Sequence, residues 1–178
     1  IGFAQAQCSP YASPGHWNDP DMLVVGRVGW GPSLRESRLT PNEQYTHISL
    51  WCLLSSPLLI GCDLTQLDEF TMNLLTNDEV LEVNQDPLGH QAARIAQDGM
   101  LEVWAKPMED GSTAVGLFNR DETPKTVVAK WSDLKLSGRM RVRDLWRQQD
   151  VGVFAGQYGS EIPRHGVMLL RLFPTEGK

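Results

Sequence analysis

The sequence lacks any long hydrophobic run and has few basic residues in its first half. Its longest apolar stretch, residues 49–62, is interrupted by two serines, a proline and a glycine, so it falls short of the ~20 apolar residues of a membrane helix. Of the 16 Lys and Arg residues, three lie within residues 1–90. The sequence also has no basic cluster interleaved with aromatic residues, the pattern typical of nucleic-acid binding. We therefore expect neither a membrane nor a nucleic-acid partner.

Cysteine is also scarce. The three cysteines, Cys8, Cys52 and Cys62, form neither a Cys-x-x-Cys pair nor a zinc spacing, and an odd number leaves one thiol unpaired within the chain. This argues against a disulfide framework. The remaining composition, with 41% hydrophobic residues and a formal net charge of −6, is typical of a globular protein with a sizeable core.

Residues 1–90 carry the signals of alternating helices and strands. Residues 40–43, Thr-Pro-Asn-Glu, form a capping box that predicts the start of a helix, and the proline at residue 57 follows its end. The continuous apolar run at residues 58–62 predicts a strand buried on both faces of a parallel sheet. Acidic residues in the first turn predict two further helices that begin near Asp68 and Asp78.

The period of the apolar residues changes to two after residue 91, which predicts an antiparallel β-sandwich. Asp-Gly and Ser-Gly turns separate strand-like segments at residues 101–105, 113–118, 126–130, 140–145 and 167–172. The predicted fold class is therefore α/β followed by all-β, with one domain over residues 1–90 and a second over residues 91–178. The 178 residues are too few for a complete (β/α)₈ barrel of about 250.

The densest polar and aromatic segment is Trp17-Asn18-Asp19-Pro20-Asp21-Met22. Pro20 favours an extended, rigid segment, so we expect the carboxylates of Asp19 and Asp21 to project to the same side. Carboxylates beside a tryptophan are typical of a sugar site, because the aromatic face covers the C–H side of a pyranose while the carboxylates accept hydroxyl protons.

The residue types alone leave three interpretations of this segment open. In the first interpretation, Asp19 and Asp21 are the catalytic pair of a retaining glycosidase, whose carboxylates stand ~5–5.5 Å apart. In the second, they bind a metal together with His16. In the third interpretation, which residue types favour, the acids bond local backbone while Trp17 and Met22 fill the core. Two motifs of the second half, residues 144–146 and 164–166, are likewise expected to be structural, with sugar binding as the alternative.

Four motifs in a fixed order resemble the melibiase-type α-galactosidases of glycoside hydrolase family 27. These motifs occupy residues 14–23, 45–51, 57–63 and 83–89. The resemblance is specific over residues 14–90. It is weaker over residues 91–178, which resemble the family's C-terminal β-sandwich.

This resemblance implies a retaining exo-glycosidase that removes terminal α-linked galactose, or N-acetylgalactosamine in close relatives, with no cofactor and no metal. It also implies the last βα units of a (β/α)₈ barrel, followed by an antiparallel β-sandwich, and a secreted, periplasmic or lysosomal location. The family's nucleophile, in a Lys-x-Asp motif, and its acid/base both come earlier in the chain than the segment present here. We therefore expect no catalytic residue in this chain and no activity from the chain alone.

The expected partners are an α-galactoside oligosaccharide and either an N-terminal barrel portion or a second copy. Two alternatives remain open: a carbohydrate-binding module that does not cleave its glycan, and a structural fragment that depends on a partner.

The family pattern also assigns roles to single residues. It implies that Asp21 and Met22 bind substrate at the border of the galactose pocket, and that four residues support them from behind: Trp17, Asn18, Asp19 and Asp63. Asp19 and Asp21 thereby lose the role of catalytic pair. His47 is expected to be packed or at the solvent edge. Trp30, on a long loop over residues 26–39, is expected to shape a subsite beyond the terminal sugar.

Overall fold

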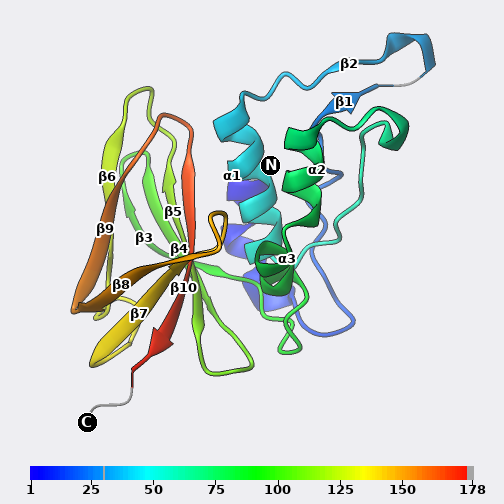
Figure 1. Cartoon of the computed structure of the whole chain (residues 1–178). Helices are drawn as coiled ribbons and strands as arrows, with labels where there is room; N and C mark the ends of the chain where they lie inside the picture. Colours follow the sequence, from blue (N-terminus) through cyan, green and yellow to red (C-terminus); the bar gives the residue numbers. More distant parts are fainter. Residues whose placement is uncertain (30, 176–178) are drawn as a thin grey trace.

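The computed structural model describes residues 1–29 and 31–175. The helices of the first half lie against one face of a β-sheet that the second half builds (Figure 1). Trp30, which we expected to shape a subsite, lies outside the described residues.

Three α-helices follow one another in the first half: α1 (Pro41–Leu53), α2 (Glu69–Thr76) and α3 (Asp78–Asn84). Short 3₁₀ helices cover Gly2–Tyr11, Gly31–Ser33 and Leu64–Gln66. The predicted capping box of α1 is confirmed, since Thr40 accepts the N–H of Glu43 and the Glu43 carboxylate accepts the N–H of Thr40 at 2.8 Å. None of the described helices combines the length and apolar character that a membrane crossing requires.

Two extended segments flank α1 and pair in parallel. Leu23 donates its N–H to the carbonyl of Leu59 at 2.8 Å and accepts the N–H of Gly61 at 3.0 Å, in a parallel bridge with Ile60. Because α1 connects these two segments in the sequence, they form a βαβ crossover, the repeating unit of a barrel.

The prediction that residues 58–62 form a strand buried on both faces is wrong for this structure. The side chains of Leu59 and Ile60 are 53% and 49% exposed. Within the described residues, this segment pairs with Leu23 and, at Cys62, with Val28, so no sheet extends across it. Val28 belongs to a two-stranded hairpin of β1 (Arg27–Val28) and β2 (Arg35–Glu36).

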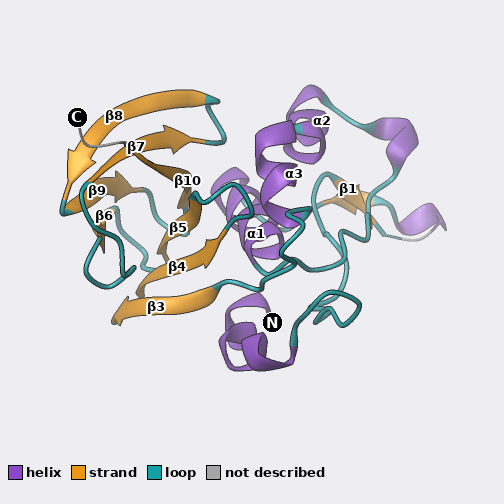
Figure 2. Ribbon diagram, turned by 90° about the horizontal axis from the view of Figure 1, so that it is seen from below, coloured by secondary structure: helices purple, strands orange, loops and turns teal. Residues whose placement is uncertain are grey.

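The second half forms a β-sandwich (Figures 1 and 2). Its larger sheet has the strand order β3-β4-β5-β10-β7-β8, and all of its neighbouring strands are antiparallel; β6 and β9 form the second, two-stranded sheet. The bounds are β3 Ala93–Asp98, β4 Leu101–Pro107, β5 Thr113–Asn119, β6 Lys125–Lys130, β7 Arg139–Asp144, β8 Gln149–Ala155, β9 Gln157–Ile162 and β10 Val167–Pro174.

All five predicted strands of the sandwich are confirmed, but β3, β8 and β9 were not predicted. β3 and β8 are the two edges of the larger sheet, and most of their residues are not buried. Edge strands bury little surface and carry polar residues, so their sequences show weak alternation.

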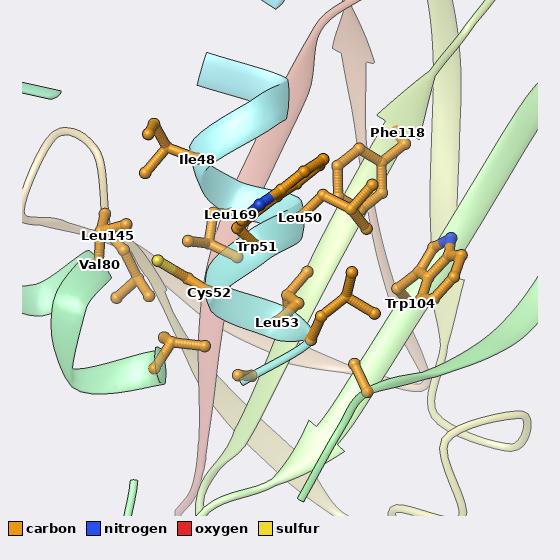
Figure 3. Close-up of a cluster of buried hydrophobic side chains, with 14 of the residues drawn as sticks. Ile48, Leu50, Trp51, Cys52, Leu53, Val80, Trp104, Phe118, Leu145 and Leu169 are labelled. Atoms are coloured by element: carbon orange, nitrogen blue, oxygen red, sulfur yellow. The ribbon is translucent and has the colours of Figure 1, made fainter. Parts of the chain in front are cut away.

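The larger sheet has a hydrophobic core on each face. Trp104 and Phe118 point from β4 and β5 toward α1, where they meet side chains such as Leu53 (Figure 3). The alternate residues Val103 and Leu117 belong to a second core, shared with β6 and β9. Because both faces are covered, the central strand β5 is apolar without interruption from Ala114 to Phe118.

Candidate functional site

The candidate site begins where the Trp17-to-Met22 motif meets the parallel pair of Leu23 and Ile60. Met22 directly precedes Leu23, so the parallel bridge brings it beside Gly61. A Cβ atom placed on Gly61 would lie 2.8 Å from the sulfur of Met22 and 2.7 Å from the carbonyl oxygen of Leu23. Only glycine fits at this position without displacing Met22.

Met22 and Asp63 line the same surface hollow, which has a volume of about 590 Å³. Other walls come from Ile60, Gly61 and Cys62 and from residues of the β1–β2 hairpin. We call this hollow the rim hollow. Two of the residues predicted from sequence are thus brought together, whereas Asp21 is exposed and is not among the residues that line it.

Asp21 occupies a left-handed backbone conformation, with φ of 79°, which is uncommon for a residue other than glycine. Its N–H donates to Oδ1 of Asp19 at 2.9 Å, and its own Oδ1 accepts the N–H of Met22 at 2.7 Å. The extended geometry that we expected across Asp19–Asp21 is therefore interrupted. Both carboxylates serve the local backbone, as the structural interpretation of the segment predicted.

The prediction that Trp17 and Met22 fill the core is wrong. Their side chains are 42% and 37% exposed, because Trp17 lies at the surface near Gly89 and Met22 faces the rim hollow. Asn18 is the residue that ties the motif inward: its Nδ2 donates to the carbonyl of Cys8 at 2.8 Å and to Oε1 of Gln91 at 2.7 Å.

The described residues offer no ligand set for the metal-binding interpretation. In residues 1–29 and 31–175, no three His, Cys, Asp or Glu side chains gather closely enough to hold an ion.

Three polar side chains of α1 hold the segment that carries Met22. Oε1 of Gln44 accepts the N–H of Gly26 at 3.1 Å, and Nε2 of His47 accepts the N–H of Val24 at 3.1 Å. Nε1 of Trp51 donates to the carbonyl of Asp21 at 2.7 Å. At positions i, i+3 and i+7 these residues share one face of the helix. This role was not predicted from the sequence, although a set of hydrogen-bonding residues on an otherwise apolar face was an available signal.

Because Nε2 of His47 accepts this hydrogen bond, that nitrogen carries no proton. Burial lowers its pKa to about 4, and the carbonyl of Met22 opposes that shift only in part. Its ring lies edge-on to that of Trp51, with centroids 4.0 Å apart. The half-buried position agrees with the packed histidine that we expected, but the hydrogen bond to Val24 gives it a specific structural task.

Asp63 caps the 3₁₀ helix that follows the second parallel segment. Its carboxylate accepts the N–H of Thr65 at 2.9 Å, the hydroxyl of Thr65 at 2.7 Å and the side-chain amide of Gln66 at 2.8 Å. The hydrogen bonds from Thr65 lower the pKa of Asp63. The residue therefore shapes the end of the rim hollow by holding the turn in place.

Comparison with known families gives two matches that follow each other along the chain. Residues 1–86 match the family described as "Alpha galactosidase A", and residues 98–172 match the "Alpha galactosidase C-terminal beta sandwich domain". A protein of Dictyostelium discoideum named "Probable alpha-galactosidase" is 39% identical over 179 residues, an alignment that covers 97% of this chain and 44% of the relative.

Two solved structures share the fold over nearly the whole chain. A β-L-arabinopyranosidase of glycoside hydrolase family 27 from Geobacillus stearothermophilus, in complex with arabinose, superposes with a TM-score of 0.92 at 34% identity and covers 98% of this chain. α-Galactosidase I from Mortierella vinacea gives a TM-score of 0.84 at 31% identity and covers 94%. The chain spans 42% of the length of each of these structures and 44% of the Dictyostelium relative.

Proposed function

The chain belongs to the melibiase-type α-galactosidases of glycoside hydrolase family 27, and from this premise we propose that residues 1–90 supply one wall of a galactoside-binding pocket. In this proposal residues 1–90 are part of the catalytic (β/α)₈ barrel and residues 91–178 are a separate β-sandwich domain. The whole protein is a retaining exo-glycosidase that hydrolyses terminal α-D-galactosides.

The observation that carries the proposal is the placement of Met22 on Gly61, across the parallel pair. Barrel enzymes build their sites at the ends of parallel strands, and the thioether of Met22 offers an apolar, polarizable surface to the C–H face of a sugar. Asp21, one residue earlier, has an exposed carboxylate that can accept hydroxyl protons. The bonds from α1 to this segment hold the wall in one geometry, which a precise binding site needs.

The catalytic step itself needs residues that this chain does not have. A retaining glycosidase uses a carboxylate nucleophile and an acid/base ~5–5.5 Å apart, and the 178 residues contain no Lys-x-Asp motif. Asp19 and Asp21 are engaged with local backbone. We therefore propose that the isolated chain binds no transition state and turns over no substrate.

The missing groups would come from a barrel portion that covers the exposed side of the parallel pair. Leu59 and Ile60 present about half of their surface there, and apolar residues next to an open strand edge favour pairing with further strands.

The Geobacillus structure favours a second substrate, a β-L-arabinopyranoside. This sugar has the ring stereochemistry of an α-D-galactopyranoside but lacks the exocyclic hydroxymethyl group. A wall that contacts only the ring would accept both sugars, whereas a wall that contacts the hydroxymethyl group would discriminate between them.

A chimera tests the proposal. Residues 1–178 replace the corresponding segment of the Dictyostelium relative, and the chimera and the isolated chain are assayed on 4-nitrophenyl α-D-galactopyranoside and 4-nitrophenyl β-L-arabinopyranoside. We expect hydrolysis of the galactoside by the chimera and none by the chain. A folded chimera inactive on both substrates would count against the proposed wall, and turnover by the isolated chain would show that its own residues are catalytic.

A further inference from the structure

A second pocket, of about 300 Å³, lies between α1 and the β-sandwich. Its walls include Asn42 and Tyr45 of α1, Asp144, Trp146 and Arg147 at the end of β7, and Ser160 of β9. We call it the interface pocket. Among the described residues, none lines both this pocket and the rim hollow.

Hydrogen bonds between the two halves of the chain fix the walls of the interface pocket. Nε1 of Trp146 donates to the hydroxyl of Ser49 at 2.8 Å, and the hydroxyl of Thr46 donates to the carbonyl of His165 at 2.8 Å. The Tyr45 and Trp146 rings meet edge to face, with centroids 4.7 Å apart. The pocket is therefore formed before any ligand arrives, as most small-molecule sites are.

The pocket contains a carboxylate with unused acceptor capacity. Asp144 is 5% exposed; its Oδ1 accepts the N–H of Arg147 at 3.2 Å, and its Oδ2 lies 3.7 Å from the guanidinium of Arg147. That guanidinium is itself on a side chain that is 76% exposed, so it neutralises Asp144 only weakly. Hydrogen-bond donors stabilise a nearly buried carboxylate, and a ligand in the pocket can supply such donors.

The charges of the lining residues restrict the ligand. Two acids, Asp144 and Glu161, face one base, Arg147, which disfavours phosphates and carboxylates. Indole and phenol rings beside a carboxylate are suited to a ligand with both C–H and O–H surfaces. The volume is at the lower end of the range for ligand sites, enough for one sugar unit.

We propose that the interface pocket is a non-catalytic site for a single neutral pyranose, bound through hydroxyl donation to Asp144. The site goes beyond the proposed hydrolysis and does not depend on it. In a glycosidase, such a site would hold a second part of the same glycan and so raise its concentration near the enzyme.

The test is a titration of the ¹⁵N-labelled chain with methyl α-D-galactopyranoside, followed by amide shifts. We expect saturable shifts confined to residues 42–49, 144–147 and 160–168. Asp144→Asn keeps an oxygen for the Arg147 N–H but loses the charge, and should weaken binding about tenfold. Ser160→Met should abolish binding by filling the pocket. The matched control, Asp133→Asn, changes an exposed carboxylate of the same sandwich and should bind like the wild type.

Three results would overturn the inference: no saturable shift up to the solubility of the sugar, unchanged affinity in both pocket variants, or shifts centred on residues 21–24 and 60–63. The last result would support the rim hollow as the binding site instead, so failure of this inference is distinguishable from failure of the proposed function. Spectra of the free variants show whether each remains folded.

Discussion

Nε2 of His47 accepts the backbone N–H of Val24 at 3.1 Å. This bond joins the middle of α1 to the strand segment that carries Met22, two residues before Val24. Because Gln44 and Trp51 bond the same segment on either side, the helix fixes its backbone from Asp21 to Gly26. The geometry of the rim hollow thus depends on a helix that lines none of it.

The burial of His47 makes stability depend on pH. The pKa of His47 is about 4 in the folded chain against an ordinary value of 6.5, so the unfolded state binds more protons between these values. The contribution of His47 to the free energy of unfolding should therefore be complete above pH 6.5. It should fall by up to about 3 kcal/mol as the pH drops toward 4. Urea unfolding at pH 7 and pH 4.5 measures this change.

His47→Gln is the control for that pH dependence, because its side-chain oxygen can still accept the Val24 N–H and does not titrate. The variant should lose less stability than the wild type over the same pH interval. Equal losses in both proteins would show that His47 is not the titrating group.

Trp51→Phe should loosen the rim segment. The change removes the hydrogen bond to the carbonyl of Asp21, whose left-handed backbone needs support, and should cost about 1–2 kcal/mol of unfolding free energy. Amide hydrogen exchange at Leu23 should become faster. Trp146→Phe loses a bond of similar length to Ser49 and should leave exchange at Leu23 unchanged; equal acceleration in both variants would contradict a local effect.

Gly61→Ala should displace Met22. The new methyl group would lie 2.8 Å from the sulfur of Met22 and 2.7 Å from the carbonyl oxygen of Leu23, and such overpacking costs about 1–3 kcal/mol. In a double-mutant cycle with Met22→Ala, part of this cost should disappear, because one of the two clashes is removed. Strict additivity would mean that Met22 does not rest on Gly61.

The burial of Lys106 should make the free energy of unfolding depend on pH in the alkaline range. This residue is 1% exposed and donates to the hydroxyl of Ser55 at 2.7 Å, and burial lowers its pKa to about 8 from 10.5. The unfolded state therefore binds more protons between pH 8 and 10.5, so stability should rise with pH in that interval relative to Lys106→Met. The variant should also be the more stable protein at pH 7. Parallel pH profiles of the two proteins would contradict the buried position.

The parts of the fold set by neighbouring residues could be predicted from the sequence. The start of α1 depends on Thr40 and Glu43, three positions apart, and the central strands β5 and β10 are apolar enough to be recognised singly. Burial of Leu59 and Ile60 could not be predicted, since it depends on which strands lie beside them. The edge strands β3 and β8 were not predicted, because strands with few buried residues show little alternation of apolar and polar residues.

The sequence indicated some residues of the candidate site but not how the site is built. The motifs indicated Met22 and Asp63, which share one hollow, and also Asp21, which does not line it. The bonds of His47 with Val24 and of Trp51 with Asp21 join residues 23 and 30 positions apart. The polar residues on one face of α1 were a signal that the helix holds some segment, but the local sequence does not identify that segment.

The most direct test of the proposed galactoside wall is the effect of Met22→Ala on the kcat/KM of the chimera for 4-nitrophenyl α-D-galactopyranoside. Met72→Ala on α2 is the matched control, because that methionine is similarly exposed, at 44% against 37%, and lies outside the rim hollow. We predict at least a tenfold loss for Met22→Ala, about 1.4 kcal/mol of transition-state stabilisation, and no loss for Met72→Ala. Equal kcat/KM values for Met22→Ala and the unmodified chimera would contradict the account.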